Sequence, residues 1–296
     1  MHVLQDRFRG TGVAIVTPFF ADGTIDWESF QKIINHIIEG TCDYLVVLGT
    51  TGETATISVS EKQQIFSFVR DVNKGRVALV AGIGGNDTHE VLHAFKTFDL
   101  KEYEAILSVA PYYNKPNQEG MYRHYKLLDE HTPLPLIIYN VPGRTGQNLT
   151  ANTQLRIARD CKNVFATKEA SGNFEQIMEI IQQKPEGFLV ISGDDALTLP
   201  MIACGAHGVI SVVANVYPAG FSEMVRKCLE GDYEFARPLH YKYMEAIQVL
   251  FAEGSPSGVK AFLSEVGLCA NTFRMPVWPV SEGHLQKIKQ LVKELS

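Results

Sequence analysis

The sequence has few cysteines, no long hydrophobic run and no signal-peptide pattern. Its five cysteines are widely spaced and form no CxxC pair, so we expect buried thiols of a reduced, cytoplasmic protein. Residues 1–9 alternate polar and apolar side chains and lack the hydrophobic segment of a secretory signal. Residues 196–222 contain no Asp, Glu, Lys or Arg, but Pro200, Gly205 and Pro218 interrupt them, which favours a buried segment over a membrane helix.

The sequence also lacks a strong excess of positive or negative residues. Charged residues make up 20% of the 296 residues, the formal net charge is −6, and no block of lysines and arginines occurs. This argues against the basic patch of a nucleic-acid-binding protein. Hydrophobic residues make up 45% of the sequence, which is enough for a large core and excludes a disordered chain. We therefore expect a folded protein with small-molecule partners, and neither nucleic acid nor membrane among them.

Eight short hydrophobic runs recur along the chain, and an amphipathic segment follows each of them. Their starts lie about 19 to 33 residues apart, the length of a strand, a helix and two loops. The runs do not alternate with polar residues, as is typical of parallel strands covered on both faces. The predicted strands are Val13–Thr17, Tyr44–Leu48, Val77–Ala81, Ala105–Val109, Leu136–Tyr139, Val164–Thr167, Leu189–Ser192 and Val209–Val213.

Helices are predicted between these strands. Asp26 is a candidate N-cap, Ser60 and Gln63 form a candidate capping box, and Thr88 opens a further helix. Eight strand–helix units predict a (β/α)₈ TIM barrel, with a doubly wound open sheet as the alternative. About 80 residues follow the last strand, so we expect a catalytic barrel over residues 1–220 and an additional helical C-terminal region over residues 221–296.

In a TIM barrel, functional side chains lie at the carboxyl ends of the strands and in the loops that follow. Lys168 directly follows the sixth predicted strand, where the loss of solvation favours its neutral amine. A neutral amine can attack a carbonyl carbon and form a Schiff base. The structural alternative is a lysine that forms an ion pair with Glu169 or Asp194.

Other strand ends carry groups that fit this chemistry. Tyr139 ends the fifth strand and can transfer a proton if hydroxyls such as those of Thr50 and Tyr113 relay it. The turn at residues 49–52 can hold a carboxylate with its backbone N–H groups, and Arg144 can bind one through two hydrogen bonds. Taken singly, each group also fits a structural role: a packed tyrosine, a simple turn, a surface ion pair.

Five motifs, in this order, resemble the dihydrodipicolinate synthase family of class I, pyruvate-dependent aldolases. The resemblance extends from about Gly12 to Pro279. Thr50 and Arg144 distinguish this family from the N-acetylneuraminate lyases, which usually have Ser at the first position and lack the Arg-Thr-Gly run. The motifs are Gly-Thr-Thr-Gly-Glu at 49–53, Pro-Tyr-Tyr-Asn at 111–114, Tyr-Asn-Val-Pro-Gly-Arg-Thr-Gly at 139–146, Lys-Glu-Ala-Ser-Gly-Asn at 168–173 and Gly-Val-Ile-Ser at 208–211.

The resemblance implies a lyase of lysine (diaminopimelate) biosynthesis that condenses pyruvate with aspartate semialdehyde and needs neither metal nor organic cofactor. Lys168 would form an imine with pyruvate, and family members usually form homotetramers, as dimers of dimers, in which Tyr113 enters the partner's site. The remaining implied roles are proton transfer by Tyr139, Thr50 and Tyr113, pyruvate carboxylate binding by Thr51, semialdehyde carboxylate binding by Arg144, and a pyruvate pocket lined by the backbones of Gly193 and Ile210.

Lysine-inhibited relatives have a regulatory site at the dimer interface. Two of its positions, often His in those relatives, are Val59 and Lys62 here, and Lys62 would repel a cationic lysine. We therefore expect weak or absent lysine feedback. The positions that match the rest of that site are Thr54, Ala55, Asn86, Glu90 and Tyr112.

Two other interpretations come from different classes of protein. Residues 89–93 match the H-E-x-x-H zinc-protease pattern, but helical periodicity directs His89 and His93 to solvent. Asp194 and Asp195 resemble a Mg²⁺ site, although a helix N-cap is the favoured interpretation. A third hypothesis is a catalytically silent binding or regulatory relative, which the presence of every polar group required by the mechanism disfavours.

Overall fold

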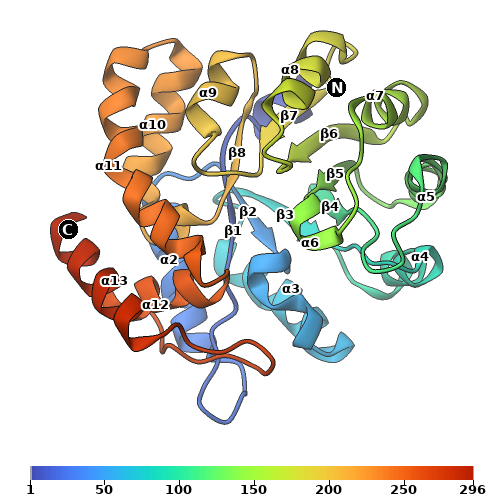
Figure 1. Cartoon of the computed structure of the whole chain (residues 1–296). Helices are drawn as coiled ribbons and strands as arrows, with labels where there is room; N and C mark the ends of the chain where they lie inside the picture. Colours follow the sequence, from blue (N-terminus) through green and yellow to red (C-terminus); the bar gives the residue numbers. More distant parts are fainter. Residues whose placement is uncertain (1, 296) are drawn as a thin grey trace.

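The computed structural model describes residues 2–295 and contains a closed barrel of eight parallel strands (Figure 1). Each strand pairs with the next in sequence, and β8 pairs with β1. The predicted TIM barrel is therefore confirmed, and the open-sheet alternative is wrong. The strands are β1 Gly10–Ala14, β2 Tyr44–Val47, β3 Ala78–Gly82, β4 Ala105–Val109, β5 Leu136–Asn140, β6 Val164–Glu169, β7 Leu189–Ser192 and β8 Gly208–Ser211.

Two strand boundaries differ from the prediction in an informative way. β1 begins at Gly10 and ends at Ala14, although the chain stays buried through Thr17. Hydrophobicity reports burial, and here burial continues after strand pairing has ended. β6 extends beyond Thr167 to include Lys168 and Glu169, both of which are buried. The prediction ended this strand at Thr167 because Lys168 and Glu169 are polar residues, which are usually exposed.

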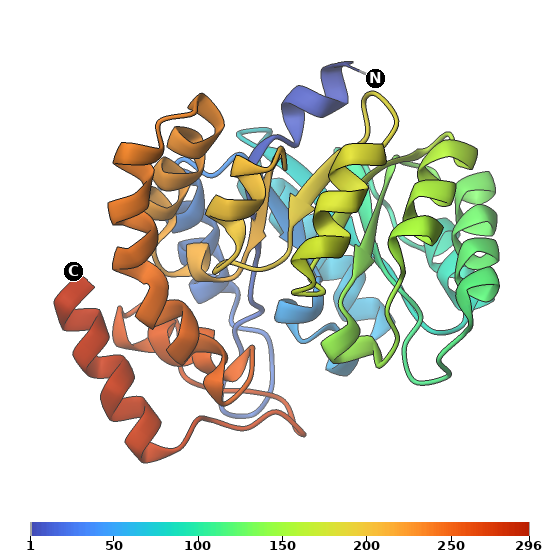
Figure 2. The same cartoon turned by 45° about the horizontal axis from the view of Figure 1, so that its top comes forward.

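Helices surround the barrel, and both views show them on its outer face (Figures 1 and 2). An N-terminal helix that the sequence analysis did not predict, α1, precedes β1. The helices of the barrel are α2 Trp27–Glu39, α3 Val59–Asn73, α4 Thr88–Thr97, α5 Gln118–His131, the short α6 Pro142–Thr145, α7 Ala151–Asp160, α8 Phe174–Gln183, α9 Thr198–Ala203 and α10 Pro218–Glu230, with α1 at His2–Arg7 and 3-10 turns η1 Thr50–Gly52, η2 Thr54–Thr56 and η3 Val213–Asn215.

Helix caps follow local chemistry, and one prediction about them is wrong. Asp26 caps α2 as predicted, because its carboxylate accepts a hydrogen bond from Ser29 N at 3.0 Å. The capping box of α3 is formed by Ser58 and Glu61 instead of Ser60 and Gln63. Ser58 N donates a hydrogen bond to the Glu61 carboxylate at 2.9 Å, while Gln63 accepts one from Asp99 N.

The chain after β8 forms the predicted additional helical region. α10 packs against β1, β8 and α2, so it closes the ring of outer helices. α11 Tyr233–Ala252, α12 Ser257–Glu265 and α13 Glu282–Leu295 pack on one another at one side of the barrel (Figure 2). Because α10 spans the predicted boundary at residue 220, the division into 1–220 and 221–296 stays a prediction.

The hydrophobic residues form two cores, one between barrel and helices and one inside the barrel. At the amino end of the barrel, the ring of Phe8 lies 5.3 Å from that of Tyr44 in an edge-to-face contact. It also lies 5.4 Å from the ring of Phe165. Phe8 is fully buried, so aromatic side chains fill this end of the barrel.

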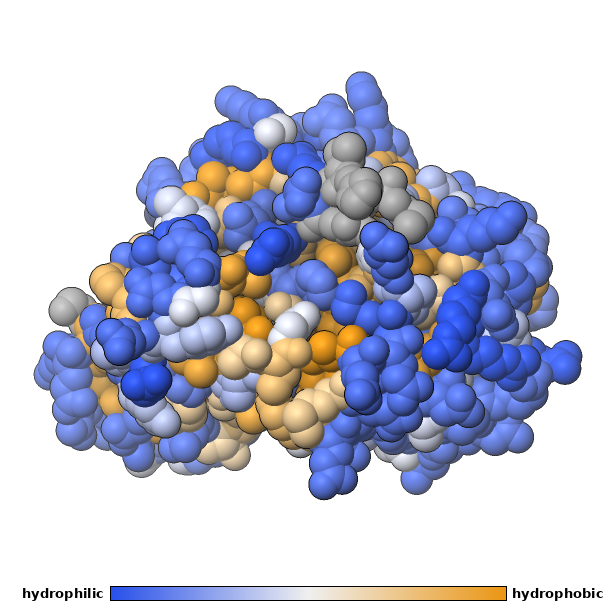
Figure 3. All heavy atoms as spheres, turned by 90° about the horizontal axis from the view of Figure 1, so that it is seen from above, coloured by the Kyte–Doolittle hydropathy of each residue, from blue (hydrophilic) through white to orange (hydrophobic). Residues whose placement is uncertain are grey.

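Within residues 2–295, no helix is long and apolar enough to cross a membrane. Hydrophilic side chains cover most of the face seen from above, with hydrophobic ones gathered near its middle (Figure 3). All five cysteines are free thiols, as predicted, and four of them are buried. The prediction of burial is wrong for Cys204, which is exposed because it lies at the C-terminal end of α9.

Candidate active site

Lys168 and Tyr139 are direct neighbours on adjacent strands at the carboxyl end of the barrel. The register of β5 and β6 pairs Tyr139 with Lys168. Their exposed fractions are 5% and 4%, and the Lys168 nitrogen lies 4.3 Å from the centre of the Tyr139 ring. The face of a phenol ring attracts a cation at this distance. The tyrosine thus accommodates positive charge on the Lys168 nitrogen.

The structural alternative for Lys168, an ion pair with a neighbouring carboxylate, is absent. Glu169 binds Asn140, Gln154 and Gln176 instead, and Asp194 accepts a hydrogen bond from Ala196 N. Across the described chain, residues 2–295, no group forms a hydrogen bond or an ion pair with Nζ of Lys168. A 4% exposed lysine whose amine has neither a hydrogen bond nor an ion pair within these residues favours a functional role.

Two further predicted residues lie beside this pair. A Cβ atom placed on Gly193 would lie 3.0 Å from Cε of Lys168 and 2.6 Å from Cβ of Ala170, so only glycine leaves room for the lysine. Ile210 on β8 is 1% exposed and belongs to the same inner core as Tyr139. Gly193 therefore borders Lys168, and Ile210 lies inside the same barrel.

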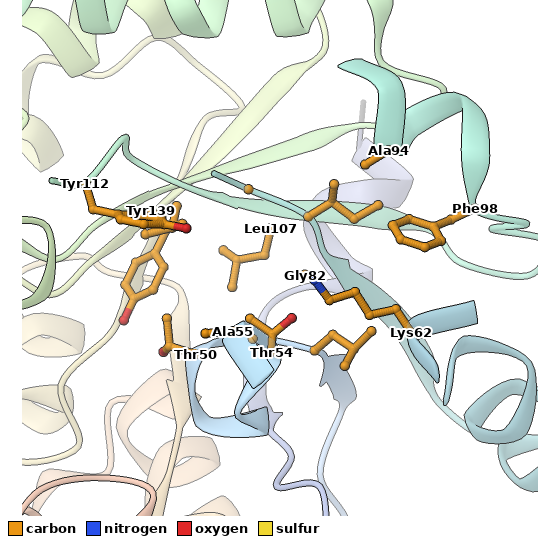
Figure 4. A pocket seen from close by; sticks show the side chains of 15 residues that line it. Thr50, Thr54, Ala55, Lys62, Gly82, Ala94, Phe98, Leu107, Tyr112 and Tyr139 are labelled. Atoms are coloured by element: carbon orange, nitrogen blue, oxygen red, sulfur yellow. The ribbon is translucent and has the colours of Figure 1, made fainter. Parts of the chain in front are cut away.

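The turn after β2 forms one wall of a cavity of about 330 Å³. Thr50 and Tyr139 line one side of this cavity, and Lys62 and Phe98 lie at the other (Figure 4). Thr51, the next residue in the turn, is 3% exposed. Thr50 thus shares the cavity with Tyr139, while Thr51 is buried in the same turn.

The far side of the cavity contains several positions of the predicted lysine site. Thr54, Ala55, Lys62 and Tyr112 line the same cavity as Tyr139. An adjoining cavity of about 310 Å³ is lined by Val59, Lys62, Asn86, Glu90 and Tyr112, among others. Burial lowers the pKa of Lys62. The amine of Lys62 therefore belongs to both cavities.

Neither Tyr113 nor Arg144 lines the cavity that contains Tyr139 and Thr50. Tyr113 has a φ of +72° and is 88% exposed, and it does not line the cavity that contains Tyr139 and Thr50. Arg144 lies in α6 and is exposed, with Nη2 donating a hydrogen bond to Ser255 O at 3.1 Å. Their predicted roles therefore stay predictions.

The predicted role of Asp194 and Asp195 as a helix cap is wrong. α9 begins after Leu197, whose side chain forms no capping hydrogen bond. Asp195 instead accepts hydrogen bonds from Val212 N at 3.0 Å and Val213 N at 2.9 Å, just beyond β8. Burial raises the pKa of Asp195 to about 6. This carboxyl group therefore connects the ends of β7 and β8.

Two buried glutamates in the motifs have partners that the sequence did not predict. The carboxylate of Glu169 accepts from side chains of β5, α7 and α8, namely Asn140, Gln154 and Gln176, and from Ser171 N. Glu53 forms a buried ion pair with Lys260 of α12. The one available signal was that each glutamate lies inside a motif. Lys260, the partner of Glu53, is 207 residues away, while the partners of Glu169 lie on three different elements.

A metal site has no support among residues 2–295, where no group of three or more His, Cys, Asp or Glu side chains could hold an ion. His89, Glu90 and His93 lie on α4 and are exposed, as helical periodicity predicts. The arrangement of its own residues therefore gives the zinc-protease interpretation no support.

The fold and the paired lysine and tyrosine define a TIM-barrel protein with an unpartnered lysine at the carboxyl end of its barrel. A model of the Dihydrodipicolinate synthetase family matches residues 7–295, and the chain belongs to this family. The resemblance inferred from the motifs is thereby confirmed.

Similar proteins match over nearly the whole chain. A 4-hydroxy-tetrahydrodipicolinate synthase of Flavobacterium psychrophilum is 50% identical over 99% of this chain and 100% of its own length. The crystal structure of dihydrodipicolinate synthase from Aquifex aeolicus, 39% identical, superposes with a TM-score of 0.93 and covers 97% of this chain and 98% of its own. A monomeric dihydrodipicolinate synthase variant, 38% identical, has a TM-score of 0.95 with 98% of each chain covered.

Proposed function

We propose that the protein is a 4-hydroxy-tetrahydrodipicolinate synthase, which condenses pyruvate with L-aspartate 4-semialdehyde in the diaminopimelate route to lysine. The full-length similarity to relatives that carry this name supports the activity. The observation that carries the mechanism is the buried, unpartnered Lys168 in contact with the ring of Tyr139. We further propose that the enzyme acts in the cytoplasm.

The reaction begins at Nζ of Lys168. The neutral amine adds to C2 of pyruvate, and loss of water gives an iminium ion. Loss of a proton from the methyl carbon then gives an enamine, which attacks the aldehyde carbon of the second substrate. The amino group of that substrate attacks C2, closes the ring and releases the lysine. The iminium supplies the electron sink, so the proposed chemistry uses no metal or organic cofactor.

Tyr139 is the proposed proton carrier for these steps. Its ring contacts the Lys168 nitrogen, and the cationic iminium would gain from the same ring face. Thr50 borders the same cavity and can pass a proton between Tyr139 and a further hydroxyl. We assign that further hydroxyl to Tyr113 of a second subunit, because Tyr113 is 88% exposed and away from its own cavity.

The substrate carboxylates need separate binding groups. Thr51 and the backbone of its turn are proposed to bind the carboxylate of pyruvate, with Gly193 and Ile210 shaping the pocket beside Lys168. Arg144 is proposed to bind the carboxylate of the semialdehyde with its free guanidinium nitrogens. We propose a homotetramer, built as a dimer of dimers, which light scattering of the purified protein tests directly.

A comparison of two substrates tests the activity. With pyruvate and aspartate semialdehyde, purified protein should give turnover when product formation is coupled to the next, reducing enzyme. With N-acetylneuraminate, release of pyruvate should stay at the background rate. The opposite pattern would identify a sister lyase that uses the same lysine. No turnover in either assay would indicate a catalytically inactive relative.

A further inference from the structure

The turn that carries Thr50 and Thr51 is bounded by two strained residues. Leu48 and Glu53 are not glycines, yet their φ angles are +59° and +55°. A side chain in the left-handed region costs about 1–2 kcal/mol and persists where the surroundings hold it. Glu53 ends η1 and begins η2, so its conformation sets the direction of the whole turn.

The side chain of Glu53 is held by an ion pair from outside the barrel. Its partner is Lys260 of α12, and the exposed fractions of the two side chains are 1% and 0%. Lys260 also donates to Thr272 O at 3.0 Å and lies 4.3 Å from the centre of the Phe19 ring. The other carboxylate oxygen of Glu53 accepts a hydrogen bond from Arg274 N at 3.3 Å.

Such a pair is a weak source of stability. Removing two charges from water costs several kcal/mol for each ion, and apolar residues of similar size often serve the fold equally well. Burial lowers the pKa of Lys260, while the Glu53 carboxylate acts in the opposite direction. A fully buried ion pair at a strained turn therefore calls for an explanation other than stability.

The surrounding contacts connect this pair to the candidate site. Thr17, after β1, donates a hydrogen bond to Gly52 O at 2.8 Å, so the turn is fixed from the barrel side. Thr272 donates to Phe19 O, so the chain after α12 is fixed to the same loop. The turn is thus held between the loop after β1 and the C-terminal region.

We propose that Glu53 and Lys260 are positioning residues that hold Thr50 and Thr51 in the conformation that binds pyruvate. This inference rests on the proposed function, in which Thr51 binds the pyruvate carboxylate. It gives the C-terminal region a direct effect on substrate affinity, exerted by a residue of α12 that contacts no substrate.

The first test is the Lys260→Met variant, which removes the cation and keeps an unbranched side chain. We expect the KM for pyruvate to rise about tenfold or more, with a smaller change in kcat, because the loosened turn binds ground state and transition state equally poorly. The pyruvate concentration that gives half-maximal borohydride trapping should rise in parallel. Trapping reports pyruvate binding without the second substrate.

Two further variants separate positioning from loss of stability. Phe8→Leu trims a fully buried side chain at the amino end of the barrel and leaves Lys260 on Glu53, so it should lower the unfolding temperature without changing the pyruvate KM. The double variant Glu53→Gln/Lys260→Met removes both buried charges and should fold even where the single variant does not. Its pyruvate KM should stay high.

The outcomes distinguish this inference from the proposed function. If wild-type protein forms no borohydride adduct with pyruvate, the proposed function fails. If the wild type forms the adduct but folded Lys260→Met, or the folded double variant, has a wild-type pyruvate KM, the positioning role is wrong. An equal rise of KM in Phe8→Leu would likewise overturn it, because the effect would then follow from destabilisation alone.

Discussion

The two ends of the barrel are built from the same strands and serve opposite purposes. At the amino end, Tyr44 of β2 and Phe165 of β6 pack around Phe8. At the carboxyl end, the turn after β2 carries Thr50, and β6 carries Lys168. The filled end contributes packing energy, so the open end can tolerate a buried amine without a partner. Within β6, the residue that stabilises the fold, Phe165, and the residue proposed for chemistry, Lys168, are therefore only three positions apart.

The largest expected effect is at the open end. Lys168→Ala should lower kcat by at least about 10³-fold, because no other group can form the imine. Circular dichroism should show an unchanged fold, since the side chain makes no hydrogen bond or ion pair within residues 2–295. The matched control is Lys162→Ala, an exposed lysine just before β6, which should keep full activity. Substantial turnover by the Lys168 variant would contradict the assignment of the chemistry to the open end of the barrel.

The filled end should respond in the opposite way. Phe8→Ala removes a fully buried aromatic side chain and should lower the free energy of unfolding by about 3–5 kcal/mol. The KM for pyruvate, measured below the unfolding transition, should not change, because the cavity with Thr50 lies at the other end. Denaturant unfolding of Phe8→Ala and the milder Phe8→Leu tests this. A changed KM without loss of stability would show that the two ends are coupled.

Acid should destabilise the protein through histidines that are wholly or partly buried, of which His124 lies in the outer layer and His207 lies beside the amino ends of β7 and β8. Burial lowers the pKa of His124 on α5 to about 4, so between about pH 6.5 and 4 the unfolded chain binds a proton that the folded chain does not. The stability contributed by neutral His124 is fully present above pH 6.5 and is lost as pH falls, by at most roughly 3 kcal/mol. Urea unfolding between pH 4 and 7 should show a shallower decline for His124→Gln than for the wild type. If the free energy of unfolding fell equally with pH in both proteins, the acid sensitivity would come from groups other than His124.

The smallest expected effect concerns free lysine. Lys62 lies half-buried in the cavity opposite Tyr139 and would oppose binding of a second amine there. We therefore expect little or no inhibition by lysine up to about a millimolar, an affinity of roughly −4 kcal/mol. Initial rates at rising lysine concentration measure this. Half-inhibition at micromolar lysine would contradict the expected absence of feedback.

Local patterns in the sequence predicted what is local in the structure. The eight strands and the cap at Asp26 follow from hydrophobic runs and capping chemistry. The strand-end position of Lys168 left a functional and a structural role open, and the family resemblance favoured the functional one. Long-range partners were not predictable. Glu53 and Lys260 are separated by 207 residues, and no periodicity records which buried charges meet. Asp195 was misassigned for the same reason, since its partners, Val212 N and Val213 N, lie beyond the next strand.

The most direct test of the account is to incubate the wild-type protein with pyruvate and borohydride and to map the modified peptide by mass spectrometry. A single reduced adduct should form, on Lys168, with Lys62 and Lys260 unmodified in the same digest. An adduct on a different lysine, or none under conditions where the protein is folded, would contradict the proposal that the unpartnered amine beside Tyr139 captures the keto acid.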